Sequence, residues 1–193
     1  MNSARRQWLV GLSSVGAGAI LIGCNKGAPE SKETKVANEG AEAEVTATED
    51  LMREHGILRR ALLVYQETAT RLTTGTSIPA GPLQKTAKLF RDFGEEYHEK
   101  KLEEVYIFPP VKKAGGAAGG YADVLIAQHQ RGREITDFIL ATTAGPNISS
   151  SNVKSFAAAL ESLVRMYEHH AAIEDTVVFP AWKQTITRTS SMK

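Results

Sequence analysis

Cysteine is nearly absent from this 193-residue chain, which contains only Cys24. A single thiol cannot form a disulfide within the chain, and it excludes the cysteine clusters that hold zinc or iron–sulfur groups. Charge of one sign is not in excess either, because 23 Lys and Arg residues balance 22 Asp and Glu residues. The sequence therefore gives no indication of a nucleic-acid partner. Any metal chemistry would have to use histidine and carboxylate side chains.

A long hydrophobic run is also missing, but the first 24 residues resemble an export signal. Arg5 and Arg6 precede an uncharged, glycine-rich stretch that is too short to span a membrane comfortably. The arginine pair resembles a twin-arginine signal, and LIGC at 21–24 resembles a bacterial lipobox. We therefore expect residues 1–24 to be a signal peptide and Cys24 to be lipidated. The protein would then be an exported lipoprotein, anchored to a membrane and facing the periplasm or the cell exterior. An ordinary secretory signal is the alternative.

The remaining chain divides into three parts. Residues 25–47 are polar, small and charged without apolar periodicity, which is typical of a flexible tether. Residues 48–183 have the apolar periodicity of a folded helical domain, and residues 184–193 form a tail.

Four amphipathic segments of about 20 residues predict an all-α domain. The first begins near Glu49, with Thr46 as its cap, and places one histidine within an apolar stripe. Its stripe residues are Leu51, His55, Leu58, Leu62, Tyr65, Ala69 and Leu72. Four such helices joined by short loops predict an up-down-up-down four-helix bundle.

Proline and glycine predict where the other three helices begin and end. The second is expected to open at Pro82 and to end at Phe108, where Pro109-Pro110 would stop it. The glycine-rich stretch 112–120 would be a flexible connector. The third helix is expected over 121–142, and the fourth from 149–151 to the Phe-Pro pair at 179–180.

The two halves of the domain resemble each other. HGILR at 55–59 matches HQRGR at 129–133, and EEVYIFPPVK at 103–112 matches EDTVVFPAWK at 174–183. Each half thus contains one helix with His-x-x-x-Arg and a second with a histidine, an acidic pair and Phe-Pro. The repeat gives four of the five histidines equivalent positions.

Histidines and carboxylates occupy apolar faces of these helices. His170 and Glu174 are four residues apart and share the core face of the fourth helix, whereas His169 is rotated off it by about 100°. A lone buried histidine is more often a hydrogen-bonded core residue. One histidine in each of four helices, with two carboxylates, would be costly to bury without strong partners. A pair of metal ions would supply those partners.

One spacing departs from the regular helix. His98 and Glu103 are five residues apart, so both reach the same face only if a π-bulge lies between them. Glu99, four residues before Glu103, is the alternative to His98 as the group that this helix contributes.

Four motifs in order make the chain similar to the hemerythrin-like, or HHE cation-binding, family. They are EDLMREHGILRR, EYHEKKLEEVYIFP, LIAQHQRGR and MYEHHAAIEDTVVFP, and together they cover about residues 49–183. The resemblance implies a four-helix bundle around two iron ions of a non-haem centre, and manganese is accepted by the same ligand types. By position it implies these ligands: His55, His98, Glu103, His129, His170 and Glu174.

The resemblance also suggests functions. Oxygen-carrying members have a further histidine at the position of Arg133, so the set here is closer to bacterial di-iron proteins associated with nitric oxide stress and iron–sulfur repair. We expect a centre that binds or reacts with O2, NO or peroxide. An iron-holding or iron-sensing module without catalysis is the alternative, and a structural bundle with a vestigial site is a third. The sequence specifies no redox partner and no enzymatic reaction.

Four further side chains are candidates for supporting the centre. Arg59 and Arg133 each follow a histidine by four residues and either orient the bridging carboxylates or extend to the end of the bundle. Tyr97 and Tyr167 are expected to pack in the core, or to hydrogen-bond to the site. Small residues near His129, Gly132 and Thr136, are expected to leave space for a small ligand.

Overall fold

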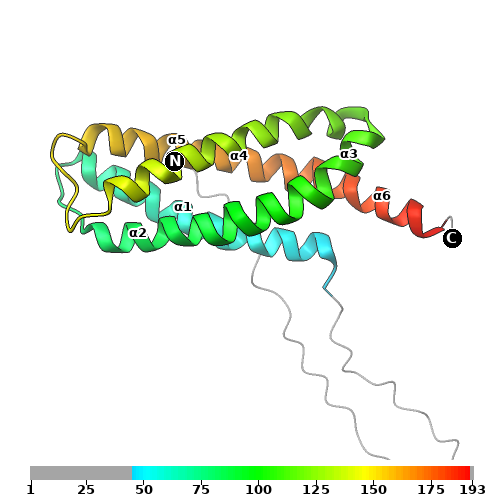
Figure 1. Ribbon diagram of the computed structural model, residues 1–193, viewed down its shortest axis with the longest axis horizontal. Coiled ribbons are helices and arrows are strands. Elements are labelled where there is room, and N and C mark those ends of the chain that lie inside the picture. Colours follow the sequence, from blue (N-terminus) through cyan, green and yellow to red (C-terminus); the bar gives the residue numbers. More distant parts are fainter. Residues whose placement is uncertain (1–44, 192–193) are drawn as a thin grey trace, which may run out of the picture. The chain divides into compact units, whose positions relative to one another are not determined.

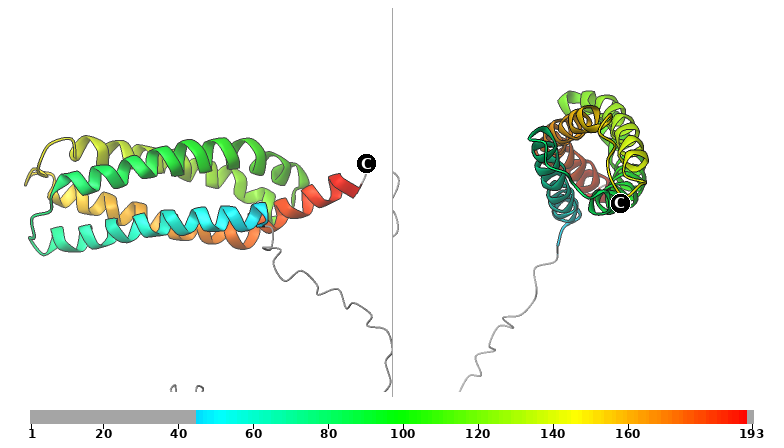
Figure 2. Two further views of the ribbon diagram at one scale, coloured as in Figure 1. Left: turned by 90° about the horizontal axis from the view of Figure 1, so that it is seen from below. Right: turned by 90° about the vertical axis from the view of Figure 1, so that its left-hand side faces the viewer.

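The helices expected from the sequence are present in the computed structural model, which describes residues 45–191 (Figure 1). The elements are α1 (Ala47–Thr73), α2 (Ala80–Leu89), the π-helical segment η1 (Phe90–Ile107), α3 (Phe108–Ala114), α4 (Gly116–Thr142), α5 (Val153–Ile173), the π-helical segment η2 (Glu174–Val178) and α6 (Phe179–Ser191). They form four helical runs, α1, α2–η1–α3, α4 and α5–η2–α6, that lie side by side as a bundle (Figures 1 and 2). Within residues 45–191 the chain is all-helical, and its only β-type pairing is an isolated bridge between Pro79 and Asn147.

The first helix begins as its sequence predicts. The Thr46 hydroxyl accepts a hydrogen bond from the Glu49 N–H, and the Glu49 carboxylate accepts one from the Thr46 N–H, both at 3.3 Å. This reciprocal capping box satisfies two backbone donors that the first turn leaves free. All seven residues of the expected stripe are buried.

The expected stops at the two Phe-Pro pairs are wrong. The chain remains helical through Pro109 and Pro110 to Ala114, and through Pro180 to Ser191. In both cases a π-helical segment ends and a new α-helix starts at the phenylalanine, so the prolines lie in a first turn. A missing N–H has little effect there because first-turn N–H groups lack helical acceptors.

The glycine-rich stretch is a sharp corner rather than a flexible connector. Gly115 has φ 74° and ends α3, and α4 begins at Gly116 instead of near Tyr121. Glycine adopts this backbone conformation without the clash of a Cβ atom. A Cβ atom on Gly119 would lie 3.2 Å from the carbonyl oxygen of Val111, so this glycine allows α4 to pass close to α3.

Two apolar clusters fill the bundle, and α1 contributes to both. Leu51 packs with Ile107, Phe108 and Phe179 in one cluster, and Leu58 belongs to the other. His55 is buried between these leucines, and the four buried histidines with the carboxylates that contact them form a polar layer between the clusters. The buried polar and charged residues of this part of the chain are Glu54, His55, Thr68, Glu95, His98, Glu99, Glu103, His129, Thr136, Thr143, His170 and Glu174.

The signal peptide, Cys24 and nearly all of the expected tether lie outside the described residues. Among the helices that the structure describes, none has the length and apolar character needed to cross a membrane.

Candidate metal centre

The π-helical segment η1 brings His98 and Glu103 together. Its backbone hydrogen bonds link each residue to the one five positions away, so side chains at that spacing reach the same face. The Nε2 atom of His98 lies 3.2 Å from Oε1 of Glu103. The expected π geometry is confirmed, and it extends over 18 residues rather than a single bulge.

Four histidines, one from each helical run, meet in the polar layer. Each is at most 2% exposed. Their Nε2 atoms form two pairs, with 2.9 Å between His55 and His98 and 3.1 Å between His129 and His170. Each pair combines the two histidines of one sequence repeat.

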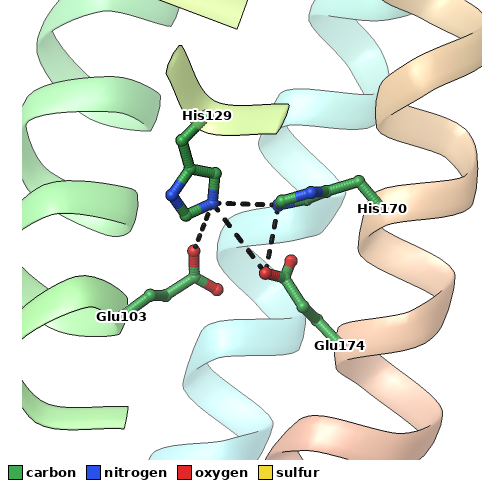
Figure 3. Close-up of side chains that lie close together, drawn as sticks. All are labelled: Glu103, His129, His170 and Glu174. Atoms are coloured by element: carbon green, nitrogen blue, oxygen red, sulfur yellow. Dashed lines mark hydrogen bonds and ion pairs between the residues drawn. The ribbon is translucent and has the colours of Figure 1, made fainter. Parts of the chain in front are cut away.

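Glu103 and Glu174 connect the two histidine pairs, and Figure 3 shows both carboxylates beside His129 and His170. Oε1 of Glu103 lies 3.2 Å from His98 Nε2, and its Oε2 lies 3.3 Å from His129 Nε2. Oε1 of Glu174 lies 3.0 Å from His170 Nε2, and its Oε2 lies 3.3 Å from His55 Nε2. Each carboxylate therefore directs one oxygen at each histidine pair, which is the arrangement of a bridging ligand.

The bridging oxygens have no other partner. Both carboxylates are completely buried, and none of their four oxygens makes a hydrogen bond in the described part of the chain. Buried polar groups are normally hydrogen-bonded, because an unpaired one is costly. A cation between the imidazoles and these carboxylates would satisfy all of them together.

The outer nitrogen of each of these four histidines has an acceptor. The Nδ1 distances are 2.7 Å from His55 to Asp175, 2.5 Å from His98 to Glu54, 2.9 Å from His129 to Glu104 and 2.9 Å from His170 to Gln128. A proton shared with these acceptors places the hydrogen on Nδ1 and leaves the Nε2 lone pair free to bind a metal. The inward Nε2 atoms are therefore the ligand atoms that the geometry favours.

These four acceptors were not identified from the sequence, although the repeat contains them. Glu54 and Gln128 directly precede the first histidine of each half. Glu104 and Asp175 are the second members of the two acidic pairs. Each half thus supplies an acceptor to its own second histidine and another to the first histidine of the other half.

Arg59 and Arg133 bind these outer acceptors rather than the bridging carboxylates. Arg59 donates to Asp175 at 2.5 Å, and Arg133 donates to Glu104 at 2.6 Å. The two arginines therefore orient the groups that orient His55 and His129. Their expected contact with the bridging carboxylates is replaced by this indirect one.

The two tyrosines differ. Tyr97 is 40% exposed and stacks on Phe93 at the surface, so its expected core position is wrong. Tyr167 is buried, with its ring 5.4 Å from that of His170, and its hydroxyl donates to Glu99. Glu99 is buried as well, but its oxygens bind Tyr167 and Arg133 and no imidazole.

Gly132 leaves space, but Tyr167 fills it. A Cβ atom at position 132 would lie 2.5 Å from the Tyr167 hydroxyl oxygen. The expectation that this glycine makes room for a small ligand is therefore wrong. Its role in the structure is to admit the tyrosine.

A small cavity lies elsewhere beside the histidines. Its volume is about 10 Å3, and its walls include His55, His98 and His170 together with apolar Leu58 and Leu62. This is close to the minimum that holds one water-sized molecule.

The electrostatics of the layer favour positive charge. Burial lowers the pKa of His98 and His129, but Glu103 and the outer carboxylates outweigh it and raise both to about 10. Burial alone would raise the pKa of Glu103, but His98 and His129 hold it well below its ordinary value. The same carboxylates would attract metal cations: with neutral imidazoles and ionised carboxylates, the layer would carry a net negative charge.

The donor set agrees with this electrostatic preference. In the described part of the chain three groups of side chains have ligand atoms close enough to share an ion. They are His55–His98–Glu103, Glu103–His129–His170–Glu174 and Glu99–Glu104–His129. Imidazole and carboxylate donors suit iron and manganese. The residues present fit a two-metal centre with Glu103 common to both positions.

Comparison with known proteins also indicates a cation-binding domain. The family model of the hemerythrin HHE cation binding domain matches residues 46–182. The chain is 40% identical over 185 residues to uncharacterized protein Rv1995 of Mycobacterium tuberculosis and to uncharacterized protein Mb2018 of Mycobacterium bovis. Each alignment covers 94% of this chain and 72% of the relative. No solved structure matches the chain significantly.

Proposed function

Because this chain belongs to the hemerythrin HHE cation-binding family, we propose that it holds two iron ions in its polar layer and binds or reacts with O2, NO or peroxide there. The observation that carries the proposal is the set of inward-facing ligand atoms, of which the four carboxylate oxygens have no hydrogen-bond partner in the described part of the chain. Four inward Nε2 atoms and four carboxylate oxygens converge in a buried volume, and the outer nitrogens are already satisfied.

The distances support a ligand assignment. His55 and His98 would hold one ion, and His129 and His170 the other. Glu103 and Glu174 would bridge the two positions with one oxygen each. His98 rather than Glu99 is the group that η1 supplies, because Glu99 is engaged by Tyr167 and Arg133. Manganese would be accepted by the same donors.

The surroundings suit a small reactant. A bound iron pair would supply reversible electron transfer. Phe179 stacks on His55 and Phe108 stacks on His129, so apolar rings cover one side of the layer and exclude water. The cavity of about 10 Å3 beside the histidines is on the scale of one water-sized molecule, so it suits a very small reactant better than a larger substrate.

We also propose that the domain acts at a membrane surface outside the cytoplasm. Arg5-Arg6, the LIGC segment and the polar stretch that follows support this. An exported centre built from residues of all four helical runs would form only in the folded chain. Export of the folded protein through the twin-arginine route would allow iron to be loaded first.

Metal analysis combined with absorption spectroscopy tests the function. Purified protein should contain about two irons per chain, because the ligand set provides two positions. Its visible bands should change on exposure to O2, NO or peroxide. Bound iron without any such response would support the iron-holding alternative, and absence of bound metal after reconstitution would refute both.

A further inference from the structure

The hydrogen bonds of the four Nδ1 atoms are alike in the two histidine pairs except at one position. His55 and His129 each donate Nδ1–H to a carboxylate that also binds an arginine. The other two histidines differ. His98 has the carboxylate of Glu54 as its partner at 2.5 Å, whereas His170 has the amide oxygen of Gln128 at 2.9 Å.

Glu54 and Gln128 occupy the same place in the repeat. At this position the two halves differ by the charge of one carboxylate. Each directly precedes the first histidine of its half and reaches the second histidine of that half. The described contacts of Glu54 include no arginine or lysine, and its side chain is 12% exposed. A carboxylate acceptor makes an imidazole a stronger donor to a metal than a neutral amide does.

Glu99 does not restore the balance. It lies near His129, but its oxygens accept hydrogen bonds from Tyr167 and Arg133. It shares the Arg133 guanidinium with Glu104. It gives no imidazole of the second pair an additional acceptor.

We propose that the two metal positions are unequal, with the His55–His98 position binding its ion more tightly because of Glu54 and the His129–His170 position more weakly because of Gln128. This inference rests on the proposed function. Removal of an outer partner of a metal-binding histidine lowers metal affinity by about 10–100-fold. The two positions should differ by a factor in that range. The first ion occupies the His55–His98 position, and the ion at the His129–His170 position exchanges more readily.

Four full-length proteins test the inference: wild type, Gln128→Glu, Glu54→Gln and the double exchange. Each is depleted of metal and dialysed against buffers of fixed free Co2+, and bound cobalt per chain is measured. Cobalt is a suitable probe because Co2+ binds the same donors as Fe2+ and lies next to it in the affinity series of divalent metals. Far-ultraviolet circular dichroism verifies that each protein retains its helices.

The pattern across the four proteins is diagnostic, because repulsion between two cations separates the binding steps even at equal sites. In Gln128→Glu the weaker binding step should move to about 10–100-fold lower free Co2+. The two steps should then lie closer together in free Co2+ concentration. In Glu54→Gln the tighter step should weaken by a similar factor, again narrowing the separation. The double exchange should restore the separation, because it places the carboxylate on the other side.

The inference would be overturned if Gln128→Glu left the weaker step at the wild-type Co2+ concentration, or if the two steps of the double exchange lay no further apart than those of the single variants. Failure of the proposed function gives another result. In that case the wild type would bind no cobalt at any free concentration at which the protein remains folded.

Discussion

The Nδ1 atom of His55 lies 2.7 Å from a carboxylate oxygen of Asp175, although 120 residues separate them. Asp175 also accepts a hydrogen bond from Arg59, one turn further along α1. One carboxylate thus orients a buried imidazole and ties η2 to α1. The orientation of His55 and the packing of the helices therefore depend on the same side chain.

Asp175→Asn should lower metal affinity by about 10–100-fold, because an amide is a weaker acceptor for His55 and does not pair with Arg59. Asp123→Asn is the matched control, since Asp123 pairs with Lys112 at the surface and has no described contact with a histidine. Chelator competition measures both variants. Equal affinity of the Asp175 variant and the control would contradict the role given to this carboxylate.

Gly132→Ala should destabilise the fold by about 1–3 kcal/mol, because the new methyl group overlaps the Tyr167 hydroxyl. Gly120→Ala is the matched control on the same helix. A Cβ atom there meets nothing within 4 Å, so the substitution should be neutral or stabilise by up to about 1 kcal/mol. Urea unfolding of both variants checks this. A neutral Gly132→Ala would show that Tyr167 moves freely.

Glu95 predicts a dependence of stability on pH away from the metal ligands. Burial, with the neighbouring Glu99, raises its pKa from 4.5 to about 7. Below pH 4.5 the carboxyl group is protonated in both states. Between 4.5 and 7 the unfolded chain releases a proton that the folded chain keeps, so rising pH favours unfolding.

Glu95→Gln should therefore gain stability relative to wild type as pH rises through this window. At about 1.4 kcal/mol per pH unit, the gain is at most about 3 kcal/mol and is constant above pH 7. Lost pairing with Arg91, 2.8 Å away in the wild type, reduces it. Unfolding free energies from pH 4 to 8 at fixed metal content give the result, with the exposed Glu161→Gln as control. A difference independent of pH would contradict the raised pKa.

Cys24→Ala tests the proposed membrane anchor. The variant should remain unlipidated and move from the membrane fraction to the soluble fraction, because the LIGC motif loses its acceptor thiol. Fractionation followed by mass spectrometry of the mature N-terminus is the measurement. Unchanged association with membranes would exclude lipidation at this residue.

Periodicity and spacing predicted most of the layer but not its outer contacts. The stripe of α1 placed His55 inside because apolar neighbours at three- and four-residue spacing leave it no other face. The five-residue spacing of His98 and Glu103 indicated π-helical geometry, because side chains at this spacing share a face only in a π-helix.

Other features depended on tertiary structure that no local pattern records. Proline was read as a helix stop, although after a π-helical segment it starts a new first turn. Tyr97 was expected in the core, but η1 turns by a different angle per residue, which places this side chain outside. The hydrogen bond between Asp175 and His55 links the last helical run to the first, and no local sequence pattern indicates it.

The most direct test of the metal centre compares two neighbouring histidines. His170 is buried with its Nε2 3.0 Å from Glu174, whereas His169 is exposed on the outer face of the same helix. Iron per chain should be measured for the wild type, His170→Ala and His169→Ala, with circular dichroism to verify folding. The wild type and His169→Ala should hold about two irons, and His170→Ala should lose at least one of them. Equal iron content in the two folded variants would contradict the centre described here.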